Sequence, residues 1–134
     1  MPVRSLTSSV MQWPRREQVI AAATAWAGGI IQIDPTILAV GYFGSYARNQ
    51  AGVGSDLDLV VIVAASEERV ELRSLRWDFA TIPVPVDVLV YTLAEWHHLA
   101  IASNRMHRTL QSEAVWLVAE ALAKPYLERE GEAV

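Results

Sequence analysis

The sequence predicts an α+β fold, a mixed β-sheet of about three to five strands flanked by helices. Apolar runs of strand length occur at 37–43, 57–63 and 86–91. Segments with apolar residues at helical spacing lie between and around these runs, and turn signals such as Asp34-Pro35 separate them. The run 57–63 stays apolar on both faces after its second residue. We therefore expect it at the centre of the sheet.

The first two predicted helices are marked by their end signals. Pro14 suits the first turn of a helix, which we expect to end at Gly28-Gly29. Ser66 is a candidate N-cap for a second helix, with acidic residues in its first turn. The apolar face of that second helix is expected to consist of Leu72, Leu75 and Phe79.

Further elements follow the third strand. Thr92-Leu93-Ala94-Glu95 has the pattern of a capping box and predicts a helix. Another helical segment is expected at about 104–111, and 114–118 is either a short strand or the start of a last helix. We interpret 1–134 as a single domain, with 1–12 and 125–134 peripheral.

Composition excludes several classes of function. The 134 residues carry a net charge of −4, which gives no strong signal for nucleic-acid binding. Cysteine is absent, which excludes disulfides, thiolate catalysis and cysteine-bound metals. No apolar stretch approaches the roughly 20 residues needed to span a bilayer, and no leader segment is recognisable. We expect a soluble, cytoplasmic protein without a membrane partner.

Three aspartates form the strongest functional pattern. Asp56 and Asp58 open the second apolar strand, and Asp87 opens the third. Because strand side chains alternate, Asp56 and Asp58 point the same way with Cα atoms about 6.5–7 Å apart. Carboxylates placed in this way suit two Mg²⁺ ions, and Asp87 completes the set if its strand lies beside the second in register. The structural alternative is a cap for Asp56, a solvated strand-edge acid for Asp58 and an ordinary strand-entry residue for Asp87.

A small-residue turn precedes these carboxylates. Gly44 allows a sharp turn and close approach to a ligand, and Ser45 offers a hydroxyl and an N–H to an anion. The segment 44–49 is expected to form a turn or a short helix. Arg48 is either a phosphate contact or a solvent-facing arginine.

Together these residues resemble the nucleotidyltransferase superfamily with the DNA polymerase β-like fold. The resemblance is carried by Gly44-Ser45-Tyr46-Ala47-Arg48-Asn49, then Ser55-Asp56-Leu57-Asp58-Leu59, then Asp87. The chain is most similar to the minimal nucleotidyltransferases, which are often paired with a HEPN-domain toxin. Asn49 stands where many members have glycine, and asparagine tolerates the left-handed backbone better than most residues.

The resemblance implies transfer of a nucleoside monophosphate, usually AMP, from NTP to a hydroxyl. Asp56, Asp58 and Asp87 would be the catalytic, metal-binding residues for two Mg²⁺ ions, and Gly44, Ser45 and Arg48 would bind the ATP or other NTP. It also implies a HEPN toxin as partner, with the chain as antitoxin. A homodimer is the other assembly that we consider. The alternative functions are a stand-alone enzyme acting on small aminoglycoside-like molecules and a non-catalytic nucleotide-binding or antitoxin module.

Tryptophans and histidines are given lesser roles. Trp26 and Trp96 are expected in the core, whereas Trp13 and Trp77 are candidates for a protein interface. Adjacent histidines at 97 and 98 point about 100° apart on a helix and do not suit one metal. All three histidines, including the one at 107, are expected at the surface or partly buried.

Overall fold

The computed structural model of the chain describes residues 13–120 and 123–127, and its centre is a four-stranded mixed sheet. The strands are β1 (Ile37–Phe43), β2 (Leu57–Val63), β3 (Val86–Thr92) and β4 (Val115–Ala119). Their order across the sheet is β3-β2-β1-β4, with β1 antiparallel to both its neighbours and β2 parallel to β3. The predicted α+β class is confirmed, and the segment near 114–118 takes the strand alternative.

The second strand is central, as its apolar sequence predicts. Every residue of β2 is buried except Asp58, which is partly exposed. Since β2 and β3 are parallel, both enter the sheet at the same end. The first residues of these two strands therefore lie side by side.

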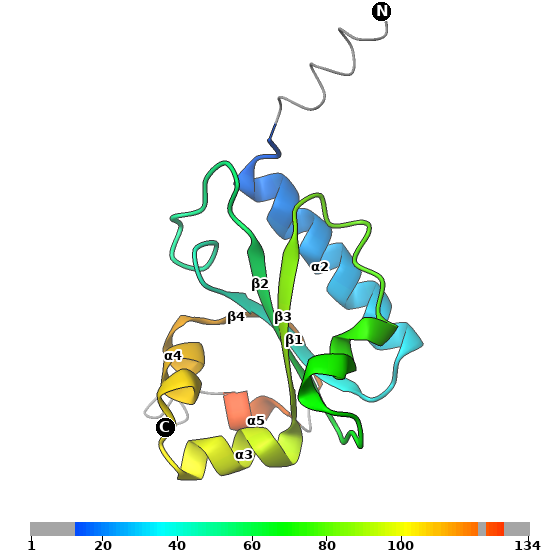
Figure 1. Cartoon of the computed structure of the whole chain (residues 1–134), viewed down its shortest axis with the longest axis vertical. Coiled ribbons are helices and arrows are strands. Elements are labelled where there is room, and N and C mark those ends of the chain that lie inside the picture. Colours follow the sequence, from blue (N-terminus) through cyan, green and yellow to red (C-terminus); the bar gives the residue numbers. More distant parts are fainter. Residues whose placement is uncertain (1–12, 121–122, 128–134) are drawn as a thin grey trace, which may run out of the picture.

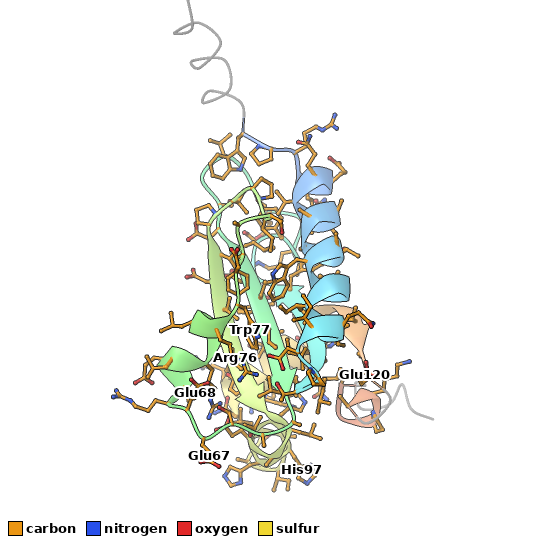
Figure 2. All side chains as sticks on the ribbon, turned by 90° about the vertical axis from the view of Figure 1, so that its right-hand side faces the viewer. Glu67, Glu68, Arg76, Trp77, His97 and Glu120 are labelled. Carbon is orange, nitrogen blue, oxygen red and sulfur yellow. The ribbon has the colours of Figure 1, made fainter. Side chains whose placement is uncertain are left out.

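One face of the sheet is covered by the long helix α2 (Arg16–Ile33), seen along the sheet in Figures 1 and 2. Its buried side packs with Leu59 and Val61 of β2. The prediction that this helix ends at Gly28-Gly29 is wrong. Both glycines are exposed, and the helix continues because Ile30 and Ile31 beyond them still pack against the core.

The other face is packed by α3 (Leu93–Ile101), α4 (Arg105–Glu113) and the short α5 (Lys124–Leu127), which gather at one end of the molecule in Figure 1. Trp96 and Leu110 are buried against Val60 and Ile62 of β2. The predicted capping box of α3 is present, since the Thr92 hydroxyl accepts from the Glu95 N–H at 3.1 Å and the Glu95 side chain accepts from the Thr92 N–H at 2.9 Å.

Two residues on this face of the sheet are more buried than the sequence predicts. His107 is buried, with its ring centroid 4.4 Å from that of Trp96. Leu127, within the stretch expected to be peripheral, is also buried. The rest of that stretch from 128, like 1–12, lies outside the described residues.

The helix predicted after Ser66 is replaced by a single 3₁₀ segment, η1 (Val70–Arg76). Its expected apolar face is wrong, because Leu72 and Leu75 are exposed and Arg73 is buried instead. Phe79 lies beyond the segment and stacks on Trp26, with 4.8 Å between ring centroids. The apolar contact with the core is thus made by the loop after η1 and not by Leu72 or Leu75 of η1.

Trp77 is a core residue, not an interface residue as predicted. It is buried, meets Trp26 edge to face, and donates its indole N–H to Asp34 Oδ2 at 2.9 Å. Arg76, beside it in Figure 2, lies 5.3 Å from its ring centre and also bonds Asp34. Among the residues that the structure describes, no helix combines the length and the apolar character of a membrane span.

Candidate active site

The site begins with two carboxylates on neighbouring strands. Asp58 of β2 and Asp87 of β3 are direct partners in the parallel register. By alternation, Asp58 shares the face of Val60 and Ile62 rather than the α2 face. Asp56 immediately precedes β2 and is exposed. Asp87 therefore lies on a strand that neighbours β2 in register, as its expected place beside Asp58 requires.

The electrostatics of this group are unfavourable without a cation. Burial raises the pKa of Asp58 above its ordinary value, and the charges of Asp87 and Asp56 raise it further. Arg48 opposes the shift, while Glu113 adds to it. Negative charge is thus concentrated at one end of the sheet, where a bound cation would relieve it.

The small-residue turn lies directly beside Asp58. Phe43, the last residue of β1, pairs with Asp58 across the sheet, so the chain turns at Gly44 next to this carboxylate. Gly44 has φ +73°, and a β-carbon there would overlap Oδ2 of Asp58. Glycine takes this backbone conformation without strain, and its lack of a β-carbon leaves room for the Asp58 carboxylate.

Backbone hydrogen bonds close the turn at 44–49. The Arg48 N–H donates to the Gly44 carbonyl at 3.0 Å, and the Gln50 N–H donates to the Ser45 carbonyl at 2.8 Å. Asn49 takes the left-handed conformation, with φ +59°. The segment is a turn rather than a helix, and asparagine here serves where glycine is common in the resembling family.

Arg48 is held by a residue that sequence reasoning missed. Glu113, the last residue of α4, accepts from Arg48 Nη1 at 3.0 Å through Oε1 and from the Gly44 N–H at 2.8 Å through Oε2. A glutamate at a helix end just before a strand carries no signal of this contact. The signal appears only once β4 is known to pair with β1, which brings the end of α4 next to the turn that follows β1.

The residues present fit Mg²⁺ as donors, although they do not form a closed cage. Asp56, Asp58 and Asp87 supply hard carboxylate oxygens, and two of them are adjacent in register. In the part of the chain that the structure describes, no three acidic or histidine side chains are grouped closely enough to hold a metal on their own. Mg²⁺ is commonly bound by one or two carboxylates together with substrate phosphates, which is the arrangement this site suits.

Comparison with known proteins finds solved structures with a similar fold. No curated protein matches the chain. Among solved structures, a toxin–antitoxin complex with AMP-PNP is similar over 78% of this chain and 80% of that one, with 14% identity and a TM-score of 0.52. A nucleotidyltransferase structure from Sulfolobus solfataricus is similar over 79% of this chain and 89% of that one, with 21% identity and a TM-score of 0.52.

At these identities the two structures establish the shared fold alone. The model of the nucleotidyltransferase domain family matches residues 29–110, which include the turn, all three aspartates and the strands that position them. The chain belongs to the nucleotidyltransferase domain family.

Proposed function

We propose that this protein is a Mg²⁺-dependent nucleotidyltransferase that moves AMP from ATP to a hydroxyl group. The observation that carries the proposal is the pairing of Asp58 with Asp87 in register, with the Gly44 turn against Asp58. In this arrangement the carboxylates and the Gly44 turn, which we propose binds phosphate, lie at the same end of the sheet. Phosphoryl and nucleotidyl transfer depends on such positioning and charge stabilisation.

The roles proposed for the residues follow from their chemistry. Gly44, Ser45 and Arg48 bind the triphosphate. The acceptor oxygen bonds to the α-phosphorus, and the bond from that phosphorus to the bridging oxygen breaks, with its electron pair leaving on pyrophosphate. Asp87 accepts the hydroxyl proton. Mg²⁺ ions, when held by Asp56, Asp58 and Asp87, supply charge neutralisation at the phosphates.

The proposed acceptor is a hydroxyl on a HEPN-domain toxin, which makes the chain the antitoxin of the pair. The support is the family resemblance together with the likeness in fold to a toxin–antitoxin structure containing AMP-PNP. That structure also supports an adenine nucleotide as donor. We place the reaction in the cytoplasm, where ATP and a partner toxin would both be available.

Transfer of label from α-³²P-ATP tests the proposal. The protein is incubated with Mg²⁺ and labelled ATP, with and without the protein encoded by the neighbouring gene. The inactive variant is Asp56→Ala/Asp58→Ala, and the matched control is Glu67→Ala/Glu68→Ala, which removes two exposed carboxylates beyond the far end of β2.

The expected result is label on the partner protein with the wild type and the control variant, and none with the double aspartate variant. Label on an added aminoglycoside but not on the partner would instead identify a stand-alone small-molecule enzyme. Tight binding of the partner without any transfer would identify a non-catalytic antitoxin. Either result contradicts the proposal.

A further inference from the structure

We propose that Glu113 is a positioning residue for nucleotide binding, which holds the Gly44 turn and orients Arg48 toward the phosphates. The inference rests on the proposed function, because it concerns the same site. Its basis is the pair of contacts that one carboxylate makes to both ends of the turn: the Gly44 N–H at 2.8 Å and Arg48 Nη1 at 3.0 Å.

The first step of the argument is the register of the sheet. Gly41 pairs with Trp116 and Tyr42 pairs with Val115 in the antiparallel ladder of β1 and β4. Continued by two residues, the ladder places Gly44 opposite Glu113. The ladder stops before this point, and the Glu113 side chain supplies the acceptor for the Gly44 N–H. The turn is thus anchored to the end of α4, two residues before β4 begins, at the position where the chain leaves the sheet.

The second step concerns the other oxygen of the same carboxylate. The Glu113 side chain is only 17% exposed, whereas the Arg48 side chain is 48% exposed. A mostly buried carboxylate therefore holds one side of a guanidinium that otherwise faces solvent. Arg48 Nε also donates to Gln50 Oε1 at 3.0 Å. With two fixed contacts, the guanidinium keeps a defined orientation and still has donors to offer a phosphate.

The third step concerns charge. Glu113 adds a negative charge that repels the carboxylate of Asp58. This repulsion is unfavourable, and the bonds that Glu113 accepts from the Gly44 N–H and Arg48 offset it. Holding the turn and the arginine in place explains why an acid is found here.

The experiment compares nucleotide kinetics of Glu113→Ala, Glu113→Gln and Glu120→Ala. Glu120 lies just after the other end of β4 and is exposed, so its variant is the matched control. Glutamine keeps one oxygen for the Gly44 N–H but cannot also accept from Arg48, since its other group is a donor. KM for ATP and kcat are measured from initial rates, Kd for Mg²⁺-ATP by titration calorimetry, and folding by thermal unfolding.

We expect KM and Kd for ATP to rise about tenfold in Glu113→Ala, from loss of charge-assisted hydrogen bonds, while kcat changes less. Glu113→Gln should lie between this variant and the wild type, and Glu120→Ala should equal the wild type. In an Arg48→Ala background, Glu113→Ala should have a smaller effect than it has alone, because part of its role acts through Arg48.

Two results overturn the inference. Values of KM and Kd within twofold of the wild type in both Glu113 variants show that the contacts do not serve nucleotide binding. Tighter binding in these variants shows that the carboxylate competes with the phosphates. If Glu113→Ala fails to fold, the comparison of Glu113→Gln with Glu120→Ala decides. If the wild type binds ATP but transfers no label, the proposed function fails, and the Kd values still decide the role of Glu113.

Discussion

Gly44 and Asp58 are packed so closely that a β-carbon on the glycine would overlap the carboxylate oxygen Oδ2. The contact joins the turn after β1 to the start of β2, because Phe43, the residue before Gly44, pairs with Asp58 across the sheet. Because Gly44 also has φ +73°, both the close contact and the backbone conformation favour glycine here.

We predict that Gly44→Ala strongly reduces nucleotidyl transfer, because the added methyl group displaces the Asp58 carboxylate. Gly54→Ala is the matched control. Gly54 has a similar positive φ of +86°, but a β-carbon there meets nothing within 4 Å. Both variants carry the backbone strain of about 1–2 kcal/mol, and only Gly44→Ala carries the clash. Label transfer is measured with equal concentrations of folded protein for the two variants. Equal activity in Gly44→Ala and Gly54→Ala would contradict the prediction.

Arg73 and Glu95 form the most buried ion pair among the described residues, with bonds of 2.6 and 3.0 Å between the guanidinium and the carboxylate. The Arg73 side chain is 7% exposed and also donates to the Val90 carbonyl. Glu95→Ala leaves this buried charge without its partner, and it also removes the acceptor of the Thr92 N–H in the capping box of α3. We predict a loss of about 2–3 kcal/mol in unfolding free energy, less than for a fully buried pair because Glu95 is 40% exposed.

The control for this prediction is Glu71→Ala. It breaks the Arg69–Glu71 pair, whose side chains are both more than half exposed. Surface pairs of this kind contribute about 0–1 kcal/mol. Urea unfolding of both variants measures the difference, and equal losses would show that burial of Arg73 does not matter.

Because His107 is buried, we predict that the unfolding free energy depends on pH. Burial lowers the pKa of this histidine below its ordinary value, so the folded protein disfavours the charged ring. As pH falls below about 6.5, the unfolded chain takes up a proton that the folded protein resists. The unfolding free energy should therefore decline from pH 7 toward pH 5, by at most about 1.4 kcal/mol per pH unit from this group.

His107→Phe should remove this part of the decline, since phenylalanine keeps an aromatic ring against Trp96 and does not titrate. His98→Phe, at an exposed position on α3, is the control and should leave the decline in place. Unfolding free energies at pH 7.5, 6.0 and 5.0 test this. The same slope in wild type and His107→Phe would refute it.

Much of the sheet could be predicted because its strands are short apolar runs with clear boundaries. The pairing of Asp58 with Asp87 required only that two consecutive parallel strands be adjacent in register. Glu113 could not be predicted, because its contact with Gly44 depends on an antiparallel pairing between β1 and β4, far apart in the chain. Local sequence carries no record of such a pairing.

The wrong predictions for two helices have a similar origin, because they too relied on local sequence. Local end signals at Gly28-Gly29 and Ser66 were outweighed by tertiary packing: Ile30 and Ile31 extend α2 against the core, and Arg73 is buried where an apolar face was expected. Intrinsic propensity is a weak guide where burial of neighbouring residues decides the backbone.

The glycines within α2 lead to a stability prediction. Gly28 and Gly29 are exposed in a helix interior, and a β-carbon at either position meets nothing within 4 Å. Replacement by alanine reduces the entropy of the unfolded chain without a clash. We predict that Gly28→Ala and Gly29→Ala each raise the unfolding free energy by about 0.5–1 kcal/mol. A loss of stability measured by urea unfolding would indicate that this stretch of α2 is not helical in solution.

The repulsion between Asp58 and Asp87 leads to opposite effects on stability and activity. Burial and two neighbouring acids raise the pKa of Asp58, so its ionised form destabilises the folded state at neutral pH. Since the pKa of Asp58 is raised in the folded protein, this destabilisation appears as the pH rises through the ordinary pKa of an aspartate and is absent at lower pH.

Asp58→Asn keeps the shape of the side chain and removes its charge. In EDTA at pH 7.5 it should therefore unfold at higher urea concentration than the wild type. When Mg²⁺ is supplied, it should transfer no label from ATP, whereas the wild type does. Glu67→Gln, a charge removal at an exposed position, should change neither quantity. Were Asp58→Asn less stable than the wild type, the carboxylate would be a structural residue whose hydrogen bonds outweigh its charge. A variant that is more stable and inactive is the pattern expected of a site that accumulates like charges for catalysis.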